Sequence, residues 1–371
     1  MKSLSLLVGS LIGLFVLLEF VIFRFALPAA DLPLLSVDSS KIIRYQENQT
    51  GTYRLQSEIN ARFQINEQGW NSKHKSYSKA KTPGVLRICI IGDSYVEALQ
   101  VDFDQSVAER LEEEFHERGI QAEVYRFGLS GAPLSHYVYW LEREVFQFQP
   151  DLVIINLVHN DFDQSITPAR GTYSRSFATV KKTEGEFILT EPISYSRNFS
   201  WWVKKRAIFR YLWVREQISP DTLRALFEKV ARLLKNSDNS GGNKKVESAT
   251  RSSDPNPVTS SVRATTDFLF SVLRDVARVE SLPVMLVMDG NRGASSPNAI
   301  LGKLNKMVQE LAYSYQLPLL DLSELFAKDY AEHQRAHQFR FDGHWNAYAH
   351  SLVAGAIYSF ISEEILLHLN K

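Results

Sequence analysis

The sequence contains a single cysteine among its 371 residues, and this scarcity excludes two kinds of architecture. One cysteine cannot form an intrachain disulfide framework or a cysteine-based metal site. Cys89 lies within a short apolar run, so we interpret it as a small buried hydrophobic residue. The chain also has no excess of charge, with 42 basic and 42 acidic residues. This balance argues against a nucleic-acid partner, because binding phosphates requires a basic face.

Motifs for nucleotide cofactors and metals are missing as well. No phosphate-binding or dinucleotide-binding glycine pattern occurs in the sequence. Near the C-terminus, His333 and His337 are spaced to share a helix face, and His344 and His350 follow. No glutamate lies between His333 and His337 in the zincin arrangement, so we do not predict a zinc site there.

One long hydrophobic run is present, at residues 4–23, and it is interrupted by only one acidic residue, Glu19. About 20 apolar residues suffice to cross a bilayer. We expect residues 1–27 to form an uncleaved transmembrane anchor, although the small residues at 26–30 also fit a signal-peptide cleavage site. Lys2 precedes the run, and the positive-inside rule then places it in the cytoplasm. The prediction is a single-pass protein of the inner (plasma) membrane with its domain on the periplasmic or extracellular side.

Short apolar runs alternate with helical patterns through most of the remaining chain. Such alternation predicts an α/β domain with a parallel, doubly wound sheet, which we assign to residues 85–371. The expected strands are residues 85–91, 122–125, 151–157, 283–288 and 317–322. The expected helices are residues 104–118, with Asp104 as the cap, and residues 133–148, 266–280, 298–315 and 347–365.

Two further regions do not follow this alternation. Residues 28–84 are polar and turn-rich, and we interpret them as a stalk and cover with strand-like pieces near Ile42 and Phe63. Residues 165–265 form a large insertion whose second part, 236–265, has the composition of a disordered segment. Residues 200–213 mix aromatic and cationic side chains. They fit an amphipathic helix packed on the domain, a helix on the membrane interface, or a lid or sugar platform.

A serine follows directly after the first expected strand, in the sequence Gly92-Asp93-Ser94. Open α/β sheets build their sites at the carboxyl ends of strands, so the hydroxyl of Ser94 can point into a crevice. Asp342 and His344 stand close together near the other end of the chain. An Asp–His pair can activate a serine, since the histidine takes the proton and the carboxylate orients it. The alternatives are an ordinary turn at Ser94 and a helix cap at Asp342.

Two more polar segments follow strands in the middle of the sequence. Gly131 follows the strand 122–125 and can offer a backbone N–H at close approach, and Asn160 follows the strand 151–157 and carries an amide donor. Alone, these residues also fit an ordinary glycine turn and an Asx turn. Their order along the chain, between Ser94 and His344, favours a shared site.

This ordered set of motifs, from Gly-Asp-Ser through Ser-Gly and Asn-Asp to a late Asp and His, resembles the SGNH/GDSL hydrolase family. The resemblance runs from about residue 86 to residue 366, and residues 63–70 look like the lead-in of membrane-anchored bacterial members. It implies a three-layer, flavodoxin-like fold and an activity that needs no cofactor. It also implies that Ser94 is the nucleophile, His344 the base and Asp342 the residue that orients the base. The oxyanion hole would then be formed by the N–H groups of Ser94 and Gly131 with the amide of Asn160.

The motifs depart from the usual family pattern at three positions. Ala98 and Val158 replace common family glycines, and only one residue separates Asp342 from His344. The resulting Asp-x-His-Trp form resembles sugar O-acetyltransferases of the alginate type. We therefore expect a serine esterase that cleaves O-acetyl or other short acyl esters, with an acylated cell-envelope glycan or a lipid ester as substrate. The alternatives are a glycan O-acetyltransferase with the same triad and a non-catalytic glycan-binding member of an envelope assembly system.

Overall fold

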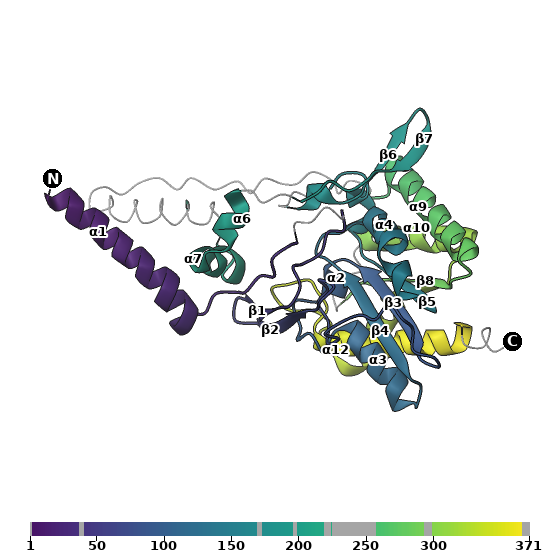
Figure 1. Ribbon diagram of the computed structural model, residues 1–371. Coiled ribbons are helices and arrows are strands. Elements are labelled where there is room, and N and C mark those ends of the chain that lie inside the picture. The colour runs from purple at the N-terminus through teal and green to yellow at the C-terminus, as the bar shows by residue number, and fades with distance from the viewer. Residues whose placement is uncertain are drawn as a thin grey trace, which may run out of the picture.

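A five-stranded parallel sheet forms the centre of the protein, in the order β4-β3-β5-β8-β9 (Figure 1). The computed structural model describes residues 2–36, 41–168, 173–195, 199–218, 224, 257–292 and 299–365. The strands are β3 (Leu86–Gly92), β4 (Ala122–Gly128), β5 (Leu152–Leu157), β8 (Val284–Met288) and β9 (Leu319–Asp321). After β3 the chain first adds β4 on one side and then crosses to β5 on the other. The strand order therefore reverses at β3, which is where open α/β sheets place their ligands.

Helices cover both faces of this sheet, as the alternating sequence pattern predicts. One face carries α3 (Val107–Glu117), α11 (Ser323–His333) and α12 (Ala347–Phe360), whose apolar side chains share a core with β3 and β8. The other face carries α4 (Leu134–Arg143), α9 (Ser260–Val279) and α10 (Ala299–Tyr315). Strands β3, β4, β5 and β8 are almost fully buried, as expected for a parallel sheet covered on both sides, and the edge strand β9 is half-buried. The predicted three-layer α/β fold is confirmed.

Several helix boundaries differ from the sequence prediction. Helix α3 begins at Val107 with Ser106 as its cap, so the predicted start at Asp104 is wrong. The predicted helix 133–148 ends at Arg143 and is followed by the short 3₁₀ helix η2 (Val145–Phe148). Helix α12 passes at Ile361 into a π-helical end, η5 (Ile361–Ile365).

The predicted disorder of residues 236–265 is partly wrong. Residues 236–256 lie outside the described part of the chain, but α9 already begins at Ser260. Thr259 caps it, and Val262 and Thr265 are buried against the domain. The polar composition misled the prediction because this amphipathic first turn needs few apolar residues to pack.

Residues 28–84, which we call the N-terminal cover, contain a β-hairpin. Its strands, β1 (Gln49–Leu55) and β2 (Ile59–Ile65), pair antiparallel, and β2 confirms the strand predicted near Phe63. The strand predicted near Ile42 is wrong, since that stretch makes only an isolated bridge between Leu35 and Tyr45. The described parts of the insertion contain the 3₁₀ turn η3 (Ser174–Ser176) and a second hairpin of β6 (Val180–Thr183) and β7 (Glu186–Leu189).

The N-terminal helix runs away from the body of the protein (Figure 1). It consists of α1 (Lys2–Leu17) continued by a π-helical part, η1 (Leu18–Ala26). Within it, Leu4–Ala26 is long and apolar enough to cross a membrane.

Residues 199–215, which we call the aromatic–basic segment, form three short helical pieces, of which the second and third pack against η1. These are α6 (Phe199–Lys204), α7 (Ala207–Phe209) and η4 (Arg210–Arg215), so residues 200–213 do not form the continuous helix that was one interpretation of their sequence. The carboxylate of Glu19 accepts hydrogen bonds from the backbone N–H groups of Ala207 and Ile208, both at 3.0 Å. The rings of Phe23 and Tyr211 stack with centroids 4.3 Å apart.

Candidate active site

Ser94 lies at the turn between β3 and the one-turn helix α2 (Ser94–Glu97), at the carboxyl end of the first strand. Asp93 caps this helix by accepting a hydrogen bond from the N–H of Tyr95 at 3.0 Å. Gly92 is required just before it, because a Cβ there would lie 2.4 Å from a methyl group of Val96. The turn therefore fixes the serine at the point where the strand order reverses.

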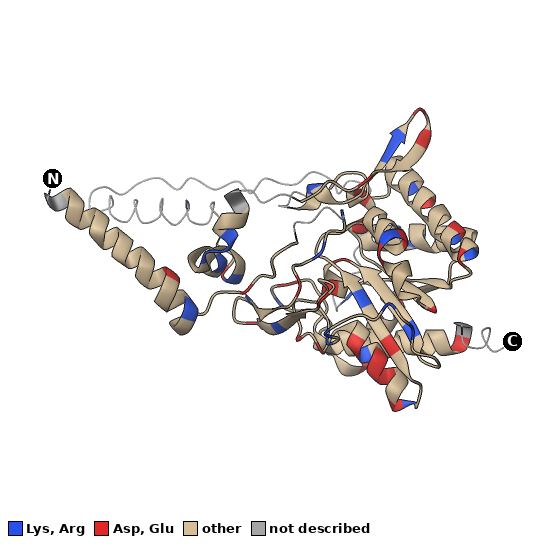
Figure 2. Cartoon of the chain, in the orientation of Figure 1, with Lys and Arg blue, Asp and Glu red and all other residues tan. Residues whose placement is uncertain are grey.

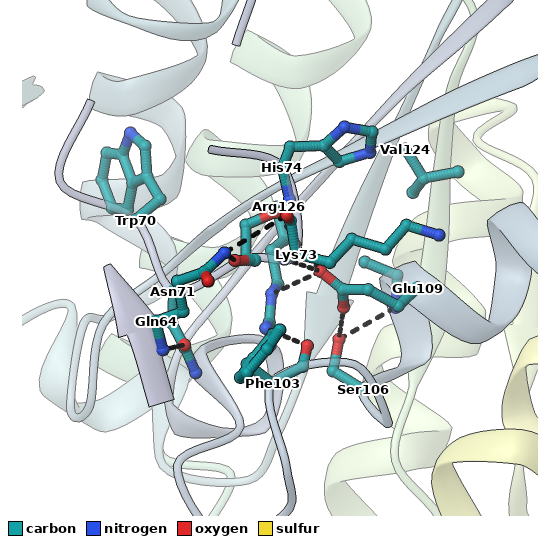
Figure 3. A network of polar contacts seen from close by, with 12 residues as sticks. Gln64, Trp70, Asn71, Lys73, His74, Phe103, Ser106, Glu109, Val124 and Arg126 are labelled. Atoms are coloured by element: carbon teal, nitrogen blue, oxygen red, sulfur yellow. Dashed lines mark hydrogen bonds and ion pairs between the residues drawn. The ribbon is translucent and has the colours of Figure 1, made fainter. Parts of the chain in front are cut away.

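A buried polar network holds the other end of α2 (Figure 3). Arg126, on β4, donates to the carbonyl oxygens of Val96 at 3.3 Å and Glu97 at 3.1 Å. The amide of Asn71 donates to the same Glu97 carbonyl at 2.9 Å. A one-turn helix leaves its carbonyls without intrahelical partners, and these donors supply them. Arg126 is itself paired with the buried Glu109 at 3.4 Å. Sequence patterns did not reveal this network, because its members come from four separate segments: α2, α3, β4 and the stretch around Asn71.

His344 joins Ser94 and Asp342 in one chain of hydrogen bonds. Its Nε2 lies 2.7 Å from Ser94 Oγ, and its Nδ1 is hydrogen-bonded to Asp342 Oδ1. The backbone N–H of His344 also donates to Asp342 Oδ1, at 2.8 Å. One residue between Asp342 and His344 is therefore enough for an orienting contact. The turn closed by the Asp342 carboxylate brings the imidazole ring of His344 to the same oxygen, Oδ1. The cap of α12 is Asn346, which accepts from the N–H of Ala349 at 3.0 Å, and not Asp342.

The loop that carries Asp342 and His344 is fixed by groups that the sequence analysis did not select. Tyr95 donates its hydroxyl to the carbonyl of Gly343 at 2.9 Å. Arg292 reaches both that hydroxyl, at 2.7 Å, and the carboxylate of Asp289, at 3.0 Å. Trp345 donates its indole N–H to Asp289 at 2.9 Å. Asp289 directly follows β8, so its place after a strand was the one signal that could have identified it.

The charges around His344 favour its protonated form. Burial lowers the pKa of His344, but the hydrogen bond and charge of Asp342, with the charges of Asp93 and Glu97, raise it above its ordinary value overall. Burial also acts to raise the pKa of Asp342, but its interactions with His344 and Arg292 outweigh this, and the net pKa is lowered. Asp342 is therefore a carboxylate near neutral pH, as a group that stabilises an imidazolium must be.

The two residues predicted to complete an oxyanion hole both follow strands that flank β3. The side-chain amide of Asn160 donates to Oε1 of Gln164 at 3.4 Å, and it is near enough to Asp93, the neighbour of Ser94, to act against the burial that raises the pKa of that acid. Gly131 follows β4 with φ of +72°, a left-handed backbone that favours glycine. Asp161, the residue after Asn160, accepts hydrogen bonds from Tyr137 and from the N–H of Val158, both at 2.8 Å. Its carboxylate therefore closes the turn that follows β5.

Glu97 is a buried acid next to Ser94, and sequence patterns did not identify it as part of the site. It is one turn beyond Ser94, and its carboxylate accepts hydrogen bonds from Ser130 and from the hydroxyl of Tyr45. Burial raises the pKa of Glu97 to about 7 despite these bonds. The contact with Ser130, from both its N–H and its hydroxyl, ties the loop that carries Gly131 to the helix that carries Ser94. Glu97 therefore sets the relative position of two of the predicted site residues.

The histidines near the C-terminus do not gather into a metal centre. Helix α11 ends at His333, so His333 and His337 do not share a helix face as predicted. His337 is buried and lies 2.7 Å from the carboxylate of Asp329. Within the described ranges, no three His, Cys, Asp or Glu side chains are grouped closely enough to hold a metal ion.

Comparison with known proteins identifies the family. The model of the GDSL-like lipase/acylhydrolase family matches residues 90–352, a range that contains all five predicted site residues. A search of curated protein sequences found no match.

Similar solved structures include the acetyl xylan esterase AlAXEase, with 12% identity over 74% of this chain and 98% of that one, at a TM-score of 0.41. A lipase/acylhydrolase from Enterococcus faecalis has 13% identity over 74% and 95%, at a TM-score of 0.39. A two-domain esterase active on acetylated mannans has 14% identity over 75% of this chain and 49% of that one, at a TM-score of 0.40. The family match extends over most of the chain and confirms the resemblance seen in its motifs. The chain therefore belongs to the GDSL-like lipase/acylhydrolase family of carboxylic ester hydrolases.

Proposed function

We propose that the protein is a serine esterase that removes O-acetyl or other short acyl groups, with an acylated cell-envelope glycan as its substrate. The observation that supports this proposal best is the hydrogen-bonded chain from Ser94 Oγ through His344 to Asp342. It lies at the carboxyl end of β3, in a chain whose family hydrolyses carboxylic esters.

The proposed reaction uses each of these groups in turn. Ser94 Oγ attacks the ester carbonyl carbon while His344 Nε2 accepts the hydroxyl proton, and the charge of Asp342 stabilises the resulting imidazolium. The carbonyl oxygen becomes an oxyanion, which the N–H groups of Ser94 and Gly131 and the amide of Asn160 stabilise. The bond to the alcohol oxygen then breaks, and His344 returns the proton to that oxygen. Water, deprotonated by His344, attacks the acyl-enzyme and releases the acid and free Ser94.

We further propose that the N-terminal helix is a membrane anchor that remains attached to the domain, which lies on the periplasmic or extracellular side. Glu19 supports this, since an unpaired carboxylate inside a bilayer is costly, whereas here two backbone N–H groups of α7 bind it. Cleavage within residues 26–30 would remove the helix that the aromatic–basic segment packs against. Figure 2 shows Lys and Arg residues along that segment, which lies near the end of the anchor. Its exposed Trp202 and Lys205 suit a membrane interface.

One observation favours a second candidate, a glycan O-acetyltransferase with the same triad. The single residue between Asp342 and His344, followed by Trp345, is the spacing that resembles the alginate-type transferases. In this alternative a sugar hydroxyl replaces water as the group that attacks the acyl-enzyme.

The test uses the full-length protein purified in detergent with p-nitrophenyl acetate as substrate. The wild-type protein should release p-nitrophenol, and Ser94→Ala should lose several orders of magnitude in rate. Ser351→Ala, which removes an exposed hydroxyl on α12, is the matched control and should keep full activity. Equal activity in the Ser94→Ala and wild-type proteins would refute the proposal. Adding xylo- or manno-oligosaccharides and measuring acetylated product separates transfer from hydrolysis.

A further inference from the structure

A cavity of about 240 Å³ lies between the N-terminal cover and the insertion, next to the proposed catalytic residues. The cover contributes residues 32–35 with Tyr45 and Tyr53, and the insertion contributes Tyr173, Tyr195 and part of the aromatic–basic segment. The domain itself contributes Leu99, Gln100 and Ser130. The cover also holds α2 through Tyr45 and Asn71, but neither the cover nor the insertion supplies a group that reacts in the proposed chemistry.

The cavity is connected to the catalytic residues through Ser130. This residue lines the cavity, and its N–H and hydroxyl bind Glu97, one turn after Ser94. Tyr173, which also lines the cavity, donates its hydroxyl to the carbonyl of Ser130 at 2.9 Å. The following residue is Gly131, a predicted oxyanion donor. A group bound in the cavity is therefore adjacent to an ester held at Ser94.

The walls of the cavity combine flat aromatic faces with a buried polar atom. Five aromatic side chains line it: Tyr45, Tyr53, Tyr173, Tyr195 and Trp201. Gln100 also lines it, is only 7% exposed, and its Oε1 has no hydrogen-bond partner among the described residues. A buried carbonyl without a donor is costly, so a ligand that brings an O–H or N–H stabilises it.

The size and chemistry of the cavity together select one class of ligand. A cavity of about 150 Å³ holds one benzene ring, so this cavity can hold one sugar ring. The apolar C–H faces of a pyranose pack on aromatic side chains, and its hydroxyls can donate to Gln100. An aliphatic acyl chain would fill the same space but would leave the Gln100 oxygen without a donor.

We propose that this cavity binds a single pyranose ring of the substrate, with a ring hydroxyl or acetamido N–H donating to Gln100 Oε1. The proposal rests on the esterase function proposed above and adds where the glycan is recognised. The cover and the insertion then supply substrate specificity, while the sheet supplies the catalytic groups.

The test compares two acetyl esters that differ in the presence of a sugar. One is p-nitrophenyl acetate, and the other is the best substrate among the methyl 6-O-acetyl derivatives of glucose, mannose and N-acetylglucosamine. Gln100→Leu should lower kcat/KM for the sugar ester about tenfold relative to the aryl ester, because one hydrogen bond to the ring is lost. Val214→Trp should lower this ratio further by filling the cavity, which Val214 lines. Gln309→Leu, the same change at an exposed glutamine on α10, is the control and should leave the ratio unchanged.

Two outcomes would overturn the proposal. In the first, Gln100→Leu and Val214→Trp both leave the ratio of the two kcat/KM values at the wild-type level. In the second, Val214→Trp lowers only the cleavage of p-nitrophenyl octanoate, which would assign the cavity to an acyl chain. A binding measurement separates failure of the sugar-site proposal from failure of the esterase function. Saturation-transfer NMR with Ser94→Ala protein should detect the corresponding methyl glycoside, and Val214→Trp should abolish the signal. Absence of signal in the parent protein would refute the sugar site even if esters are cleaved.

Discussion

Replacing Asp342 by asparagine removes one negative charge from the proposed catalytic chain and leaves the shape of the side chain almost unchanged. Asp342 Oδ1 accepts the backbone N–H of His344 at 2.8 Å and also binds the ring at Nδ1. The asparagine oxygen can keep the backbone hydrogen bond, so the loop should fold as before. Helix α12 should also be unaffected, because its cap is Asn346.

The effect on activity should be large because of what remains around His344. Burial alone lowers the pKa of His344, and Asp342 is the first of the groups that reverse this effect. Without the carboxylate, the imidazolium that forms during acyl transfer loses its nearest opposite charge, and the amide can hold the wrong tautomer. We expect kcat to fall by about 10³–10⁴-fold. We also expect the acid limb of the residual activity to move to lower pH, since the neutral ring is favoured.

The assay measures kcat for p-nitrophenyl acetate from pH 5 to 9 together with the melting temperature of wild-type and Asp342→Asn proteins. The account predicts a crippled enzyme with a nearly unchanged melting temperature. Wild-type kcat combined with an unchanged pH profile would show that Asp342 does not orient the base. Asp161 is already paired with Tyr137, so it offers no ready substitute.

Other consequences of the structure can be tested separately. Asn160→Ala should lower kcat about 100-fold with little change in KM, because an oxyanion donor acts in the transition state; a rise in KM alone would make Asn160 a binding residue. Glu97→Gln should lower kcat about tenfold at constant KM by loosening the loop of Gly131; equal changes in both constants would count against this positioning role. Arg126→Met should lower the free energy of unfolding by about 3 kcal/mol, since the buried Glu109 loses its ion-pair partner and keeps only hydrogen bonds such as those from Ser106 and Lys73. Calorimetry measures this, and a change below about 1 kcal/mol would contradict it. In the wild-type protein, activity should fall as pH drops below the raised pKa of His344. The melting temperature should fall over the same range, but through other groups. Burial lowers the pKa of His136 and His350 to about 3, so the unfolded chain binds protons more readily and stability is lost as pH falls below about 6.5. The raised pKa of His344 acts in the opposite sense, so His344→Gln should steepen this fall rather than remove it.

The parts of the fold that follow from local sequence were predicted well. Buried parallel strands are short apolar runs, and their carboxyl ends meet at one edge, so polar residues after each run fall near one site. Ser94 and Asn160 were selected on this basis. Helix starts were less certain, because polar residues near the true cap compete for the same role, as Asp104 does with Ser106.

The residues that escaped prediction act through contacts far apart in the sequence. Glu97 and Arg126 look like ordinary charged residues, and their roles depend on partners such as Ser130 and Asn71 that no periodic pattern connects. In the sequence, Glu19 is only an unfavourable charge within an apolar helix. The N–H groups that bind it could not be foreseen, because the first of them, that of Ala207, lies 188 positions later. Such pairings depend on the assembled fold.

The most direct test of the central claim is to identify the residue that reacts with a fluorophosphonate. The full-length protein in detergent is treated with the reagent and digested, and the modified peptide is sequenced by mass spectrometry. The account predicts one phosphonyl group on Ser94, no labelling of Ser94→Ala, and strongly slowed labelling of His344→Gln, because the serine needs its base. A protein that hydrolyses esters while its label is found on another residue, or that is labelled equally well without Ser94, would contradict the assignment of Ser94 as the nucleophile.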